Sequence, residues 1–71
     1  MKFDYSKLLG KLKEKGLTQA VFAEKIGTTP ATLSLKLSNV YNFKQKEISM
    51  ACDLLEISKA EIGSIFFAHL V

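Results

Sequence analysis

The outer side of one short predicted helix carries residue types that suit contact with a nucleic acid. With Leu33 and Leu37 on the core side, a rotation of about 100° per residue directs four residues outward: Ala31, Thr32, Leu35 and Ser38. Hydroxyl groups can bond base edges or phosphates, and apolar side chains can contact thymine methyl groups. No acidic residue lies between Gly27 and Lys46 to repel phosphates. This pattern favours DNA as the ligand, and the alternative is a surface helix that is merely small and polar.

Two short helices and a tight turn are needed to hold this face in place. Thr18 predicts the N-cap of the first helix, and Gly27 is typical of the left-handed residue that ends it. Thr29 predicts the N-cap of the second helix. Residues from about 18 to 38 therefore predict a helix-turn-helix motif, whose recognition helix, about 29–38, would enter the major groove.

Three further helices are predicted around this motif, so the expected fold class is all-α, a compact five-helix bundle. The first helix is expected to begin near Asp4 as its N-cap and to end at Gly16. The fourth runs from about residue 44 to 55, where apolar residues recur at helical spacing. Ser58 and Glu61 have the spacing of a capping box that opens the fifth helix.

Composition narrows the classes of function. A chain of 71 residues forms one domain, residues 1–71, with no room for an enclosed active site. No nucleophile–base pair, carboxylate pair or metal-ligand cluster is visible, so we expect no enzyme, cofactor or metal. Cys52 stands alone and is expected in the core, and His69 is expected to be exposed. Neither a signal peptide nor a span of ~20 apolar residues is present, so we expect a cytoplasmic protein without a membrane partner.

Charge is distributed unevenly along the chain, whose formal net charge is +3. Residues 1–46 carry nine Lys and three acids, a net of +6, whereas residues 47–71 carry one Lys and four acids, a net of −3. A basic first part and an acidic second part of the chain suit a protein that presents one side to a polyanion. Ordinary solvated surface charge would give the same pattern.

The run from Gln19 to Asn39 resembles the Cro/repressor-type (XRE-like) helix-turn-helix family. The matching features are Thr18-Gln19, Phe22-Ala23, Gly27 in the turn, and Thr32-Leu-Ser-Leu-Lys-Leu37. Over nearly its full length the chain is similar to short Cro-like regulators of temperate phages of Gram-positive bacteria. The resemblance implies a lambda-repressor-like fold. It also implies a sequence-specific regulator of transcription that binds a double-stranded DNA operator in a phage or prophage switch.

The resemblance also implies which residues contact DNA. Pro30, Ala31 and Leu35 would face base edges. The other expected contacts, to phosphates or flanking bases, are Gln19, Thr28, Thr29, Thr32, Ser34, Lys36, Ser38, Asn42, Lys44 and Gln45. The usual base readers of the family are Gln, Asn or Arg, which make bidentate bonds. This chain has no Arg and places Pro30, Ala31 and Leu35 there, so we expect weaker or less selective binding than is usual for the family.

The apolar outer side of the recognition helix would also suit functions in which the partner is a protein and not DNA. An exposed Leu35 and the missing bidentate readers would suit an anti-repressor or modulator that binds a phage repressor protein through the helix-turn-helix face. An antitoxin that binds a protein partner is a third candidate.

Tyr41 and Phe43 are expected to anchor their loop to the core, with stacking on bases as the alternative. The apolar C-terminus is expected to be partly core, at Ile65 and Phe66, and partly an association surface suited to a homodimer on a pseudo-palindromic operator. The alternative is that the whole segment belongs to the core. The candidate residues of the association surface are Phe67, Leu70 and Val71.

Overall fold

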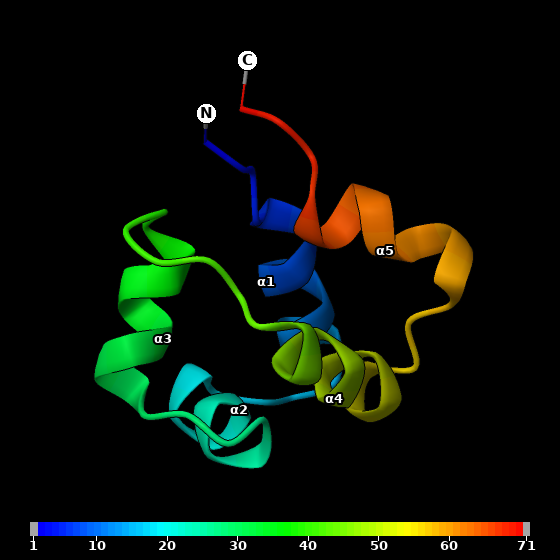
Figure 1. Ribbon diagram of the computed structural model, residues 1–71. Coiled ribbons are helices and arrows are strands. Elements are labelled where there is room, and N and C mark those ends of the chain that lie inside the picture. Colours follow the sequence, from blue (N-terminus) through cyan, green and yellow to red (C-terminus); the bar gives the residue numbers. More distant parts are fainter. Residues whose placement is uncertain (1, 71) are drawn as a thin grey trace.

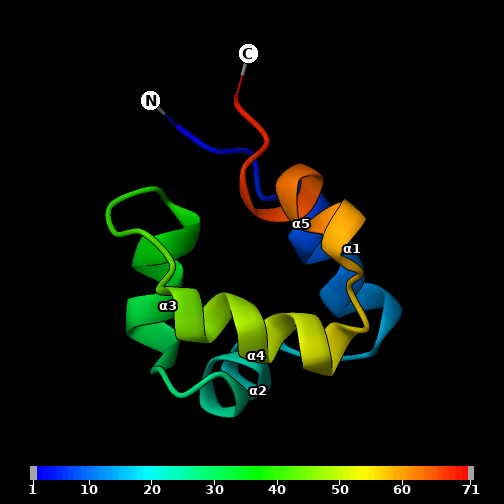
Figure 2. The same cartoon turned by 45° about the vertical axis from the view of Figure 1, so that its right-hand side comes forward.

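Five short helices surround one apolar core in the computed structural model, which describes residues 2–70 (Figure 1). In chain order they are α1 (Ser6–Glu14), α2 (Gln19–Lys25), α3 (Pro30–Leu37), α4 (Gln45–Leu55) and α5 (Lys59–Phe66). Helix α3 packs against α2, and α5 packs against α1. Helix α4 lies between α3 on one side and α5 on the other (Figure 2). The all-α, five-helix prediction is confirmed, and no β-strand occurs within residues 2–70.

Each helix contributes one large side chain that is almost completely buried. These are Leu8 of α1, Phe22 of α2, Leu33 of α3, Leu55 of α4 and Phe66 of α5. Removing a side chain of this size from water contributes about 1.5–3 kcal/mol. All five helices therefore share one core, which fixes the position of α3 relative to the rest of the chain.

Left-handed residues end four of the five helices. Their φ angles are +69° at Gly16, +82° at Gly27, +65° at Asn39 and +56° at Glu56. After each of them, the next residue donates its N–H to the carbonyl oxygen five residues back at 2.9 Å, in the pairs Leu17–Leu12, Thr28–Ala23, Val40–Leu35 and Ile57–Cys52. This is the bond of the Schellman motif, which satisfies carbonyl groups left over at a helix end. The turns after α1, α2, α3 and α4 are thus closed by the same backbone device.

The helix starts agree with the sequence except at α1. Thr18 and Thr29 accept hydrogen bonds from the N–H groups of Val21 and Thr32, each at 3.2 Å, as N-caps do. Helix α1 begins later than predicted, because Tyr5 takes the N-cap position. Asp4 stands one residue before it and accepts the Ser6 N–H at 2.9 Å.

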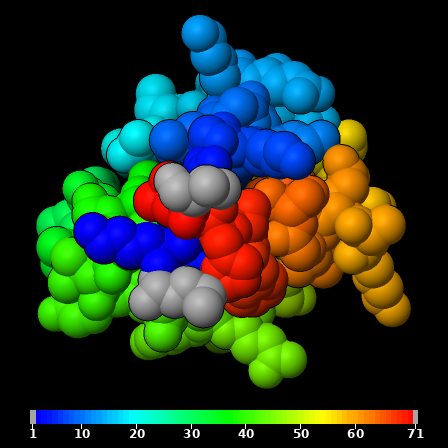
Figure 3. All heavy atoms as spheres, turned by 90° about the horizontal axis from the view of Figure 1, so that it is seen from above, coloured from blue at the N-terminus to red at the C-terminus, as the bar shows by residue number. Residues whose placement is uncertain are grey.

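The two ends of the described chain lie side by side (Figures 1 and 3). Phe3 forms an isolated antiparallel bridge with His69, whose exposed ring stacks against that of Phe3 at a centroid distance of 5.7 Å. On its other side, the Phe3 N–H donates to Asn39 Oδ1 at 2.8 Å, and Asn39 Nδ2 donates to the Phe3 carbonyl at 3.0 Å. Asn39 therefore ends α3 and also ties that end to Phe3, which in turn pairs with His69 near the other end of the chain.

Because Asn39 has this double role, we predict that two substitutions at this position lower the free energy of unfolding by different amounts. Asn39→Gly keeps the left-handed turn and loses two side-chain hydrogen bonds, each worth about 0.5–1.5 kcal/mol. Asn39→Ala loses the same bonds and also places a Cβ in the left-handed region, at a further cost of about 1–2 kcal/mol. Urea unfolding should rank the free energies of unfolding as wild type, then Asn39→Gly, then Asn39→Ala. If Asn39→Gly were as stable as the wild type, the two hydrogen bonds between Asn39 and Phe3 would not stabilise the fold.

Candidate nucleic-acid interface

Helices α2 and α3 form a closely packed pair joined by a short turn. Ala23 of α2 is fully buried, and its small side chain lets the two helices approach each other. Gly27 turns the chain out of α2 with a positive φ, which costs glycine little. The two helices and the turn occupy the positions that the sequence predicted for them, and the packing of α2 against α3 turns one side of α3 outward.

Five exposed side chains form that outer side, called the α3 face below: Pro30, Ala31, Ser34, Leu35 and Ser38. The expected outward direction of Ala31, Leu35 and Ser38 is confirmed, whereas Thr32 is half-buried. The Thr32 hydroxyl oxygen accepts a hydrogen bond from the Thr29 hydroxyl at 3.0 Å, so these two side chains partly satisfy each other. The α3 face itself is small, uncharged and free of acids.

Lys36 does not belong to the α3 face, and it is not exposed as its predicted contact with DNA would require. The side chain is on the core side of the helix, where the residue is only 3% exposed. Its ammonium group pairs with Glu47 of α4, which is 6% exposed, and lies 5.9 Å from the ring centroid of Phe43. A cation enclosed in this way cannot reach a phosphate without breaking the pair.

Glu47 holds two elements together through one carboxylate oxygen. Oε1 pairs with Lys36 and also accepts the backbone N–H of Lys44 at 2.9 Å, at the N-cap of α4. Burial alone would raise the pKa of Glu47, but the hydrogen bonds from Lys36 and Lys44 outweigh it and hold the pKa below its ordinary value of 4.5. The carboxylate is therefore ionised in the folded protein at neutral pH, and it links the end of α3 to the start of α4.

Exposed cations near the motif lie on other elements. Lys44 is exposed at the start of α4, and Lys25 and Lys46 are exposed as well. Gln19 is exposed at the start of α2, while Thr28 is half-buried in the turn. With Lys36 enclosed, the exposed positive charge around α3 is carried by the flanking lysines of α2 and α4 and not by α3 itself.

The loop after α3 exposes Val40 and Tyr41, of which the sequence suggested a role only for Tyr41, and chiefly as an anchor of the loop. Val40 is 60% exposed and Tyr41 is 55% exposed, so the expectation that Tyr41 anchors the loop is wrong. Phe43 does anchor it, because its ring packs edge-on against Tyr5 at 5.3 Å and Phe66 at 5.4 Å. The backbone N–H groups of Val40 and Tyr41 both point to the Leu35 carbonyl, at 2.9 and 3.4 Å, which keeps them next to the end of α3.

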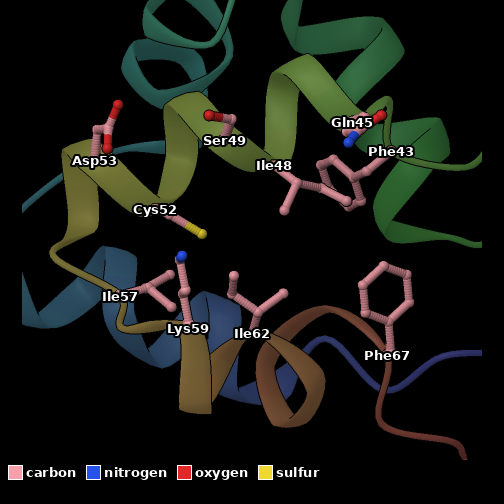
Figure 4. Close-up of a pocket in the computed structure, with 10 residues that line it drawn as sticks. All are labelled: Phe43, Gln45, Ile48, Ser49, Cys52, Asp53, Ile57, Lys59, Ile62 and Phe67. Carbon is pink, nitrogen blue, oxygen red and sulfur yellow. The ribbon is translucent and has the colours of Figure 1, made fainter.

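Asn42 and Gln45 are exposed, but both line cavities beside α4 and α5. Asn42 borders a cavity of about 290 Å³ together with Phe3, Tyr5, Phe43, Ile48, Phe66 and Phe67. Gln45 lies at one end of a groove of about 660 Å³ between α4 and α5 (Figure 4). Cys52 also lines this groove and is half-buried, not enclosed in the core, and its burial raises the pKa of the thiol.

The candidate association surface is only partly described. Phe67 lines the groove and is 47% exposed, and Leu70 is exposed as well. Val71 lies outside the described residues.

Neither a candidate metal site nor a helix able to cross a membrane is found within residues 2–70. Within residues 2–70, no three His, Cys, Asp or Glu side chains come together in a way that could hold a metal ion. None of the five helices is long and apolar enough to cross a membrane.

Comparison with known families covers nearly the whole chain. The family model described as "Protein of unknown function (DUF739)" matches residues 1–69. The chain belongs to this family. No curated protein matches the sequence. The match takes in all five helices of this DUF739 member, so the family corresponds to the whole bundle and not to the α2–α3 pair alone.

The Lys36–Glu47 pair leads to a prediction about stability. Glu47→Gln keeps an oxygen for the Lys44 N–H but leaves the Lys36 ammonium buried without a countercharge. Removing one partner of a buried pair costs about 3–5 kcal/mol. The double variant Lys36→Met/Glu47→Gln removes both charges and should regain most of this free energy of unfolding. A double variant as unstable as Glu47→Gln would show that the pair is not the cause.

The same pair predicts how stability depends on pH. The folded-state pKa of Glu47 lies below its unfolded value, so its contribution is complete above the unfolded pKa, near 4.5. That contribution is lost as the pH falls through the lower, folded-state pKa. Urea unfolding of the wild type should therefore lose more stability on acidification below pH 4.5 than unfolding of the Lys36→Met/Glu47→Gln variant. Equal losses would rule out Glu47 as a source of the acid sensitivity.

Proposed function

We propose that this protein is a DNA-binding regulator of transcription, of the Cro-like kind expected in a phage or prophage switch. The observation that carries the proposal is the α3 face, which is uncharged and acid-free and lies on a helix packed against α2. The major groove of B-DNA, about 12 Å wide, admits one α-helix. Small outer side chains would let the backbone of α3 come close to the base edges.

The residues of the α3 face suggest how DNA would be read. Ala31 and Leu35 offer apolar surface to thymine methyl groups, and Ser34 and Ser38 offer hydroxyl groups that can donate or accept. None of these residues makes the bidentate bonds that discriminate bases by about 1–3 kcal/mol each. Selectivity would therefore depend on shape and methyl contacts, and affinity on the flanking lysines.

We predict that the salt dependence of DNA binding distinguishes Lys44 from lysines elsewhere. The purified protein should bind a duplex from its own upstream region more tightly than a random duplex. Lys44→Ala should weaken both complexes and reduce the slope of log K against log salt by about 0.9, the value for one lost phosphate contact. The matched control Lys13→Ala, on the exposed side of α1, should leave the slope unchanged. Equal binding to both duplexes, with no change of slope in Lys44→Ala, would refute the proposal.

A second candidate function has its own supporting observation. Leu35, Val40 and Tyr41 are exposed at one end of α3, and backbone hydrogen bonds hold them together. Neighbouring exposed apolar and aromatic residues are typical of protein-binding surfaces. An anti-repressor or modulator would use this cluster to bind a phage repressor protein.

Two substitutions distinguish DNA from a repressor as the main target. Leu35→Glu places an acid on the α3 face and should abolish binding to either target. Tyr41→Ser lies beyond the helix and should leave DNA binding within about twofold, a change of less than about 0.5 kcal/mol. Titration with DNA and with the repressor, each monitored by calorimetry, provides the measurement. Repressor binding that is lost in both variants, without specific DNA binding by the wild type, would favour the modulator.

A further inference from the structure

The groove between α4 and α5 is an apolar surface that nothing in the described chain covers. Ile48 and Cys52 of α4 form one wall, Ile62 of α5 forms the other, and Phe67 closes one end (Figure 4). Phe67 is itself 47% exposed, so the face offers both a cavity and an apolar side chain of a size to fill one. A surface with both features can be complementary to itself.

The charges around this groove are balanced, although residues 47–71, the half of the chain that contains most of α4 and all of α5, have a net negative charge. Three of the four acids of this half form ion pairs with lysines of the first half of the chain: Glu47–Lys36, Glu56–Lys15 and Glu61–Lys11. The remaining acid is Asp53 of α4, and the only lysine of this half is Lys59 of α5. Both line the groove, both are exposed, and neither forms an ion pair within residues 2–70.

Asp53 and Lys59 lie at the same end of the groove on opposite walls, and Phe67 lies at the other end (Figure 4). We propose that a second copy of this chain covers the groove in a two-fold symmetric dimer, with the symmetry axis along the groove. Rotation by 180° about that axis places α4 of one copy on α5 of the other and keeps each end in place. Asp53 then faces Lys59 of the second copy, and Phe67 faces the wall that contains Ile48. Each contact occurs twice, as an isologous interface requires.

Size and position are compatible with this dimer. A standard interface buries about 800 Å² on each partner, roughly a sixth of the 4713 Å² surface of this chain. Helix α3 lies on the far side of the bundle from α5 in both views (Figures 1 and 2), so its outer face stays free. The inference deepens the proposed function, because a pseudo-palindromic operator requires two copies. The dimer is tested without DNA, so its failure and the failure of DNA binding are distinguishable.

Sedimentation of the purified full chain over a range of concentrations tests the proposal. The wild type should shift from monomer to dimer as concentration rises, and Phe67→Glu should weaken dimerisation strongly. Asp53→Lys and Lys59→Asp should each weaken it by about tenfold, because two favourable pairs become two repulsive ones. The charge-swapped double variant Asp53→Lys/Lys59→Asp should regain wild-type dimerisation. Leu35→Glu, on the α3 face, is the matched control and should dimerise normally.

Two results would overturn the proposal. One is a wild type that stays monomeric at millimolar concentration, which would leave the groove to a different partner. The other is a double charge variant that dimerises no better than the single variants, although circular dichroism shows it folded. Restoration by the double variant cannot come from general stabilisation, because it depends on Asp53 facing Lys59 across the two-fold axis.

Discussion

The Glu47 carboxylate is the constraint on which the arrangement of this molecule depends. It caps α4 through the Lys44 N–H and neutralises the only charged side chain of α3. A buried ion pair adds little net stability, because desolvating both charges offsets their attraction. Its effect here is to fix rotation: with Lys36 turned inward to Glu47, the helical repeat turns Ala31, Leu35 and Ser38 outward. The acid-free face and its exposed leucine both follow from that one orientation.

Local signals in the sequence were sufficient for the helices and for their ends except the start of α1. N-caps at Thr18 and Thr29 and left-handed residues at Gly27 and Asn39 act within a few residues, so the sequence displays them directly. Lys36 was missed because its charge suggested solvent, although three residues of rotation place it only ~60° from Leu33, on the core side. Its partner lies eleven residues away and belongs to another helix, and no local pattern reports such a pair.

In the loop after α3, the sequence could not predict which side chains point into the core and which into solvent. Tyr41 and Phe43 are both aromatic and two residues apart, yet one lies in solvent and the other packs between Tyr5 and Phe66. Outside a helix no fixed repeat says which residue turns inward, and the path depends on the left-handed turn at Asn39 and its tie to Phe3. The sequence supplied these residue types but could not supply their directions.

The ion pairs also change the meaning of the uneven charge. Taken along the sequence, the first 46 residues are strongly basic and the rest is acidic. In the folded chain, three lysines of the first part neutralise three acids of the second. The second part then retains one acid and one lysine, so its surface is neutral, and the whole side-chain charge of +3 resides on the first part. Within α2 and α3 the two remaining charges, Glu24 and Lys25, cancel, so the net positive charge lies on the segments around this pair and apart from the neutral, apolar groove. Positive charge of this kind would attract a polyanion, as the proposed function requires, and a neutral groove would suit burial of apolar surface in the proposed dimer.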